Sequence, residues 1–187
     1  MTVRHSARYW SFAFSLFMVA CASTPRLFEF RFSREGLTSR DGRLQYRLPE
    51  GWINATTDSP SADNLIWLVR SDYAAMLVVR EVMVDGITRK QISSTGLSRL
   101  GELMLSLESS EQGASMMKQP TPSTIDGLSA CTYEYIAGNP GDRVHVVLVD
   151  TGKRVYEVST RITETKSREM LGETISLQEA FLRTVVW

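Results

Sequence analysis

The feature that most constrains this chain is a short apolar run that ends in a cysteine. Arg4 and Arg8 precede the run, which covers residues 10–20 and closes as Met18-Val19-Ala20-Cys21. A positive segment, an apolar segment and small residues at a cleavage point are the layout of a secretory signal. The run is too short for a permanent membrane helix, which needs about 20 apolar residues. The sequence therefore predicts that residues 1–20 are a signal peptide.

Cys21 decides between two processing routes. Residues 18–21 resemble the lipobox of bacterial lipoproteins, in which cleavage precedes a cysteine that carries acyl chains; Met18 stands where leucine is preferred. Alternatively, Ala20-Cys21-Ala22 is itself an ordinary signal-peptidase site, which would release a soluble protein starting at Ser23. The lipoprotein route is favoured because it accounts for a cysteine at the end of the run. Two or more acyl chains are also enough for stable anchoring.

The predicted organisation follows from this choice. Cys21 is the lipidation site, residues 21–26 are the lipidated cysteine and its tether, and residues 27–187 are a single domain. We expect the protein in the bacterial cell envelope, held to the membrane by acyl chains on Cys21, with its domain facing the periplasm. By resemblance to enterobacterial sorting rules, Ala22 favours the outer membrane.

Composition is that of an ordinary globular domain. Of the 187 residues, 43% are hydrophobic and 22% charged. The predicted signal holds two of the 21 basic residues and none of the 21 acidic ones, so the remaining chain is slightly acidic. Nucleic-acid binding requires a concentrated basic surface. We therefore expect no nucleic-acid partner.

Hydrophobic periodicity predicts strands, then a helix, then three strands and a final helix. Alternating apolar residues predict strands over residues 26–33, 43–48, 65–70, 74–84, 128–137, 143–150 and 154–163. Residues 54–64 are expected to be a loop and residues 111–123 a linker. A long amphipathic helix is expected to begin at Thr88, with Gln91 completing its capping box, and a last helix at Ser176.

This order predicts an α+β fold, an α-β-α sandwich in which helices pack on a mainly antiparallel sheet. Asp150-Thr151-Gly152-Lys153 and Asn139-Pro140-Gly141-Asp142 are typical of turns between antiparallel strands. Met76-Leu77-Val78-Val79 is apolar on both sides, which predicts a central strand covered on both faces.

Several segments resemble the PsbP-like superfamily, which includes the extrinsic PsbP protein of photosystem II, a Ran-binding nuclear-import factor, and bacterial lipoproteins such as LpqN and DcrB. The matching segments are Tyr46-Arg47-Leu48-Pro49-Glu50-Gly51-Trp52, Tyr133-Glu134-Tyr135 and Arg154-Val155-Tyr156-Glu157-Val158. The chain departs from the family at its end, where Val185-Val186-Trp187 replaces the usual Ser-Phe. The resemblance implies an α-β-α sandwich that serves as a binding or accessory module, without shared catalytic residues.

Catalytic chemistry has little support in the residues. His145 is the only histidine after the predicted signal, and a strand position predicts a sheet-face residue rather than a metal ligand or general base. Cys131 is expected to be a buried, inert thiol. The carboxylates of Glu108, Glu111, Asp58 and Asp63 are expected on the solvated surface. Residues 139–142 are expected to form a turn rather than a cation site. We therefore predict no catalytic, cofactor-binding or metal site.

Trp52 and Trp67 are expected to pack in the core; if partly exposed, they would line a pocket or a partner surface near residues 54–64. The function that these observations favour is a membrane-anchored accessory or binding module for a protein partner or a small ligand. A secreted soluble periplasmic protein and an envelope hydrolase remain the alternatives.

Overall fold

The protein is built on a seven-stranded antiparallel sheet. The computed structural model describes residues 28–138, 142–163 and 168–187. The strand order is β3-β4-β5-β9-β8-β7-β6. These strands are β3 Trp52–Asn54, β4 Asn64–Arg70, β5 Ala75–Val82, β6 Ser115–Ile125, β7 Leu128–Ile136, β8 Arg143–Asp150 and β9 Val155–Ile162.

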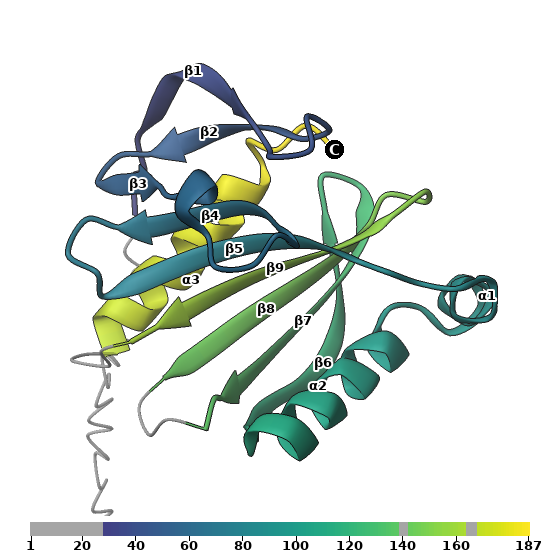
Figure 1. The fold of residues 1–187 in the computed structure, drawn as a ribbon. Helices are drawn as coiled ribbons and strands as arrows, with labels where there is room; N and C mark the ends of the chain where they lie inside the picture. The colour runs from purple at the N-terminus through teal and green to yellow at the C-terminus, as the bar shows by residue number, and fades with distance from the viewer. Residues whose placement is uncertain (1–27, 139–141, 164–167) are drawn as a thin grey trace, which may run out of the picture.

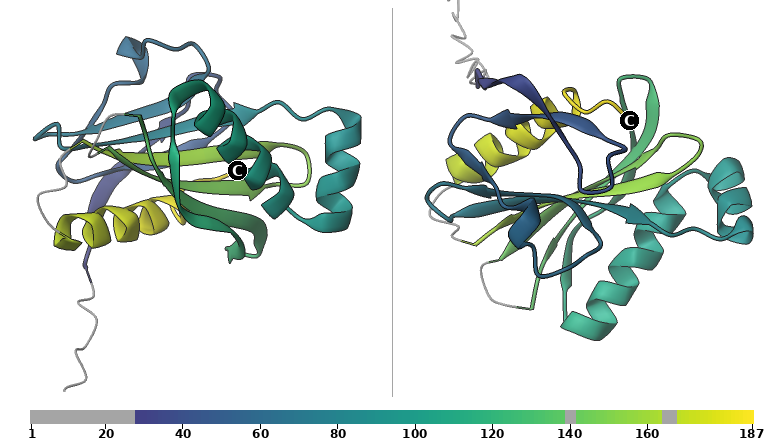
Figure 2. Two further views of the ribbon diagram at one scale, coloured as in Figure 1. Left: turned by 90° about the horizontal axis from the view of Figure 1, so that it is seen from below. Right: turned by 45° about the horizontal axis from the view of Figure 1, so that its top comes forward.

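Helices cover both faces of this sheet, which confirms the predicted sandwich (Figure 1). Helix α3 (Arg168–Leu182) and the hairpin of β1 (Phe32–Thr38) and β2 (Gln45–Pro49) lie on one face, and α2 (Ser98–Gln112) packs on β6 and β7 of the other. Figure 2 shows α3 and α2 on opposite sides of the strands. Helix α1 (Gly86–Thr95) and the short 3-10 helix η1 (Thr56–Asp58) complete the fold.

Strand β8 shows why the sheet has two cores. Its alternating side chains are buried on both sides. Val144, Val146 and Leu148 belong to the core under α2, whereas Val147 and Val149 belong to the core under α3. Successive side chains of a strand point to opposite faces, so one strand contributes to both cores.

The predicted long helix is two helices. Gly96 has φ +80 and ends α1, and its N–H donates to the Ile92 carbonyl. Such a conformation is available to glycine at little cost. The N-cap is Asp85, whose carboxylate accepts from the Thr88 N–H at 2.7 Å, so the prediction of a start at Thr88 was wrong.

Other boundaries also differ from the prediction. The first strand begins at Phe32 rather than residue 26, and the last helix runs from Arg168 to Leu182 rather than from Ser176 toward the C-terminus. The predicted linker at 111–123 is largely β6, an edge strand. It holds Pro120 and Pro122, which an edge strand tolerates because one side of its backbone has no strand partner.

Candidate functional site

Cys21, the predicted lipidation site, lies outside the described residues. The other cysteine, Cys131, is fully buried on β7, and burial raises the pKa of its thiol. A raised pKa disfavours the nucleophilic thiolate. Cys131 is therefore the buried, inert residue that its strand position predicts.

His145 lies on β8 under α3 and is 8% exposed. Its Nδ1 is 2.6 Å from Oε1 of Gln178 on α3. Within the described residues no hydroxyl or carboxylate hydrogen-bonds to this imidazole, so no Ser-His-Asp triad is assembled there. The sheet-face position matches the prediction.

The scattered carboxylates do not converge on a catalytic pair. Asp58, Asp63 and Glu111 are exposed, and Glu108 lies 3.9 Å from Arg80. Residues 139–141 lie outside the described part of the chain. Across residues 28–138, 142–163 and 168–187 no three His, Cys, Asp or Glu side chains gather as a metal site would require.

The two tryptophans separate into a core residue and a surface residue. Trp52 on β3 is 9% exposed and belongs to the core under α3. Trp67 on β4 is only partly buried. The segment after Trp52 runs beside β4: the Ala55 N–H donates to the Trp67 carbonyl, and the Trp67 N–H donates to Oγ1 of Thr56. Trp67 and this segment therefore border the same surface, as the sequence suggested.

That surface is the face of β3, β4 and β5 opposite α3, here named the open face. Helix α2 packs on β6 and β7, and among the described residues only the short 3-10 helix η1, beside β4, lies near this part of the sheet (Figure 1). Five apolar side chains lie on it, because strand pairing sets Ile53 beside Val69, Val69 beside Met76, and Trp67 beside Val78. None of the five is fully buried.

The open face overturns the expectation that residues 76–79 are covered on both sides. Leu77 and Val79 are fully buried under α3 and the β1–β2 hairpin, whereas Met76 and Val78 remain partly exposed. The strand has the apolar composition of a doubly covered strand, but no α-helix of residues 28–138, 142–163 and 168–187 packs on one of its faces. Exposed apolar surfaces of this kind mark interaction sites.

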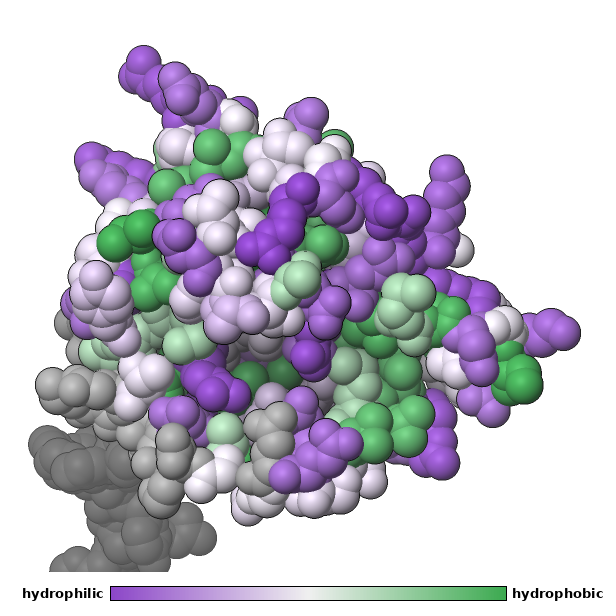
Figure 3. All heavy atoms as spheres, viewed as in Figure 1, coloured by the Kyte–Doolittle hydropathy of each residue, from purple (hydrophilic) through white to green (hydrophobic). Residues whose placement is uncertain are grey.

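A hollow of about 200 Å³ lies between the open face and α2 (Figure 3). Apolar and charged groups share its lining: Met76, Val78, Tyr135 and Val144 with Arg80, Glu108, Glu157, Ser159, Arg161 and Asn64. In Figure 3 the hollow separates the green side chains over α2 from the mixed surface above it. The open face and the hollow thus form one continuous surface.

The charges in the hollow are paired with one another. Arg80 lies 2.8 Å from Glu157 and 3.9 Å from Glu108. Burial raises the pKa of Glu157 despite the Arg80 charge, and the two carboxylates raise the pKa of Arg80 against the effect of burial. Burial, with the charges of Glu108 and Glu157, raises the pKa of Tyr135 to about 12. Tyr135 is therefore a neutral phenol at ordinary pH, and Arg80 is compensated by two carboxylates, an arrangement that can recognise polar groups of a partner.

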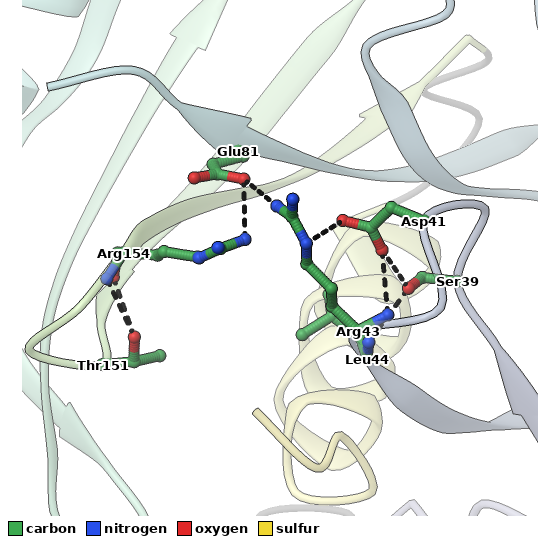
Figure 4. A network of polar contacts seen from close by, with 7 residues as sticks. All are labelled: Ser39, Asp41, Arg43, Leu44, Glu81, Thr151 and Arg154. Carbon is green, nitrogen blue, oxygen red and sulfur yellow. Dashed lines mark hydrogen bonds and ion pairs between the residues drawn. The ribbon is translucent and has the colours of Figure 1, made fainter.

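A second ionic network has a structural role (Figure 4). Glu81 on β5 accepts from Arg43 at 3.0 Å and from Arg154 at 3.3 Å. Asp41 binds Arg43 as well and accepts from the Ser39 hydroxyl. Burial opposes ionisation of Asp41, but these donors together lower the pKa of its carboxyl group. The network joins the β1–β2 turn to the sheet beneath it.

The sheet has two edge strands, β3 and β6, and the longer of the two is less suited to binding than the face of the sheet. Strand β6 is this longer edge strand and carries Lys118, Pro120 and Pro122, with irregular register between Met116 and Thr121. Prolines, charged residues and bulges on an edge oppose the addition of another strand. A partner is therefore expected on the open face rather than along β6.

Sequence reasoning identified Trp67 but missed the rest of this surface. Met76 and Val78 are predicted to be core residues because they belong to a run of four consecutive apolar residues. Arg80 and Glu157 carried no signal, because their meeting depends on the pairing of β5 with β9. The alternation of side chains does place residues 76, 78 and 80 on one face of the strand. It does not show whether a helix covers that face.

Comparison with known proteins supports the fold. No protein-family model and no curated protein matches the sequence. The solution structure of cyanobacterial PsbP (CyanoP) from Synechocystis sp. PCC 6803 is similar, with a TM-score of 0.59, 12% identity, and coverage of 89% of this chain and 98% of that chain. The crystal structure of the Saccharomyces cerevisiae Ran-binding protein Mog1p gives a TM-score of 0.53 and 13% identity, covering 84% and 96%.

The protein therefore has a PsbP-like α+β fold, as the sequence resemblance implied. At these identities the likeness concerns the fold alone. No helix in residues 28–138, 142–163 and 168–187 combines the length and apolar character needed to cross a membrane.

Proposed function

We propose that this protein is a membrane-anchored accessory module of the bacterial cell envelope that binds a protein partner through its open face. The observation that carries the proposal is the partly exposed apolar surface on β5, where no α-helix in the described part of the chain packs on Met76 and Val78. An apolar surface bordered by paired charges resembles the apolar centre and polar rim of a protein interface. The yeast structural neighbour is described as a Ran-binding protein, which is consistent with a fold used for protein binding.

The interface would combine an aromatic anchor with a charged rim. Trp67 is the largest side chain on the open face, and tryptophan is enriched among residues that dominate binding energy. Arg80 and Arg161 lie at the hollow beside it, each near an acidic group, at 3.9 Å or less. A partner segment with an apolar side chain flanked by polar groups would fit both parts of the surface.

Site-specific photo-crosslinking in intact cells tests the open face. A photoreactive residue at position 76 should give one defined protein adduct, whereas the same residue at position 83 should not. Met83 is the matched control because it follows the same strand and is 88% exposed. With the probe at position 69, Met76→Lys should abolish the adduct and Met83→Lys should not. Equal adducts at both positions, or none at position 76, would contradict the proposal.

The anchor is tested separately at Cys21. Labelling with a fatty-acid analogue should mark the natural protein and leave Cys21→Ala unmarked. The variant retains small residues at positions 20 and 22, so an ordinary signal peptidase can still cleave it and release the domain in soluble form. Unchanged labelling of Cys21→Ala would refute lipidation there. An unlabelled natural protein recovered in the soluble fraction would favour the secreted alternative.

A further inference from the structure

The strand register fixes how the groups of the open face and the hollow are arranged. Met76 on β5 pairs with Arg161 on β9, and four residues further along β5, Arg80 pairs with Glu157. Val78 lies midway between Met76 and Arg80 on the same face. Consecutive residues of a strand rise about 3.4 Å, so Arg161 and Arg80 lie about 14 Å apart along the strands. The two arginines therefore mark opposite ends of the hollow.

The floor of the hollow offers side chains and no free backbone groups. Strand β5 pairs with β4 on one side and β9 on the other, and β9 pairs with β8. The backbone N–H and C=O groups of these strands are therefore used within the sheet. An extended segment laid on Met76 and Val78 would bury its own backbone groups without partners, which is costly. An α-helix satisfies its backbone internally and can lie on this floor without that cost.

The uncovered part of this face has the width of one helix. On β8, Val144, Val146 and Leu148 are already buried in the core under α2. The side chains that β4, β5 and β9 present to the same face are partly exposed: Trp67, Val69, Met76, Val78, Ser159 and Arg161. Three strands about 4.8 Å apart give a floor about 14 Å wide, and an α-helix with its side chains is about 10–12 Å across. On α2, which borders this floor, Leu103 and Leu107 are about half exposed and extend the apolar surface (Figure 3).

The exposed charges of the hollow are positive. The side chains of Arg80 and Arg161 are 40% and 38% exposed, whereas those of Glu108, Glu157 and Asp142 are 20% exposed or less. Arg161 lies 3.9 Å from Asp142, beyond hydrogen-bond distance, and donates no hydrogen bond within residues 28–138, 142–163 and 168–187. Its guanidinium can therefore take up a carboxylate through two parallel hydrogen bonds. A second copy of this chain bound by the same face would set arginine against arginine, which disfavours it as the occupant.

We propose that the segment bound by the open face is an amphipathic α-helix of the partner protein, with an acidic side chain that pairs with Arg161. The helix lies over β4, β5 and β9 beside α2, and its apolar side rests on Trp67, Met76 and Val78. It supplies the helical layer that α2 provides only over β6 and β7. The inference rests on the proposed binding of a protein at the open face and adds the conformation and charge of the segment that binds.

The spacing of photo-crosslinks distinguishes a helix from an extended segment. In the full chain in intact cells, a photoreactive residue is placed in turn at positions 69, 76 and 78, and mass spectrometry identifies the attached residues of the partner. Residues on one side of a helix recur at intervals of three, four and seven, whereas those on one side of an extended segment recur at intervals of two. We expect the helical intervals.

Charge reversal tests the acidic group. With the probe at position 76, Arg161→Glu should weaken the adduct at least about tenfold, because ionic hydrogen bonds are replaced by repulsion. Replacing the acidic residue of the identified segment by arginine should restore the adduct, which also shows that the variant folds. Arg99→Glu is the matched control and should leave the adduct unchanged, because Arg99 on α2 is 73% exposed and does not line the hollow.

The outcomes separate this inference from the proposed function. No adduct at position 76 would overturn both. An adduct with attachments at intervals of two, with no acidic residue in the segment, unaffected by Arg161→Glu, or not restored by the charge swap would overturn the acidic helix and leave protein binding at the open face intact. An adduct with twice the mass of this chain would identify a second copy as the occupant and would also overturn the inference.

Discussion

Replacing Gly101 with alanine would insert a methyl group where α2 touches β6. An ideal Cβ at this position would lie 3.0 Å from Cβ of Pro120, 3.2 Å from its Cγ and 3.4 Å from Sγ of Cys131. The pyrrolidine ring is stiff, and Cys131 is fully buried, so neither neighbour can easily move away. The sequence leaves open whether this glycine is needed for close packing or merely tolerated; the contact with Pro120 indicates that it is needed.

Two effects of opposite sign decide the outcome. Alanine is about 1 kcal/mol better than glycine inside a helix. Extra volume in a packed core costs about 1–3 kcal/mol. We therefore expect Gly101→Ala to lower the free energy of unfolding by about 1 kcal/mol. Gly172 on α3 has no atom within 4 Å of its ideal Cβ, so Gly172→Ala should raise that energy by up to about 1 kcal/mol.

Urea unfolding of the two variants, followed by tryptophan fluorescence, measures the difference directly. The helix-propensity gain is common to both, so the gap of about 2 kcal/mol between them isolates the contact of α2 with Pro120. If Gly101→Ala is as stabilising as Gly172→Ala, then α2 does not approach β6 this closely and the packing described here is wrong.

Three further substitutions probe the core and a buried charge. Trp52→Ala should cost about 3–5 kcal/mol of unfolding free energy, and Trp67→Ala clearly less, because only Trp52 is core; equal losses in urea unfolding would mean that Trp67 is covered. Glu134→Gln should cost about 1–2 kcal/mol at neutral pH, because the ionic hydrogen bonds from Lys118 and Arg143 are lost but water can solvate both cations. Burial opposes ionisation of Glu134, but these cations lower its pKa, so its stabilisation is present above the ordinary carboxyl pKa and is lost as pH falls through the folded pKa. The gap between natural protein and variant should therefore narrow in acid, and a gap independent of pH would contradict the ion pairing.

The pattern of apolar residues predicted burial correctly for strands whose two faces are both covered. The six inner residues of strand β8 are all buried, and all of them except His145 are apolar. Strand β5 has a similar pattern, but the covering of its two faces differs, and this difference is a property of helix placement. Alternation reports the side-chain direction and polarity of a strand; it does not report which helix lies above it.

The helical errors have local causes. The apolar spacing continues from α1 into α2, so the pattern did not reveal that Gly96 turns the chain between them. Near the start of α3, Met170 and Leu171 pack against the core, but Gly172, a weak helix former, follows them and interrupts the helical pattern. Strand β6 was read as a linker because proline usually ends a strand, a rule that weakens at a sheet edge.

The candidate sites were harder to predict than the fold because each depends on long-range contacts. Sequence reasoning placed His145 correctly on a sheet face, but its partner Gln178 lies 33 residues away on α3. The pairing of Arg80 with Glu157 spans 77 residues. Such long-range contacts depend on the order of the strands and on how the helices pack on the sheet. Hydrophobic periodicity alone predicts neither.

The most direct test of the open face as a binding surface is hydroxyl-radical footprinting in native membranes compared with the purified protein. We predict that Trp67 and Met76 are protected from oxidation in membranes and become reactive after purification. Met83, which is 88% exposed, should react equally in both and serves as the internal control. If Met76 is oxidised to the same extent in membranes as in the purified protein, no partner occupies the open face and the account is contradicted.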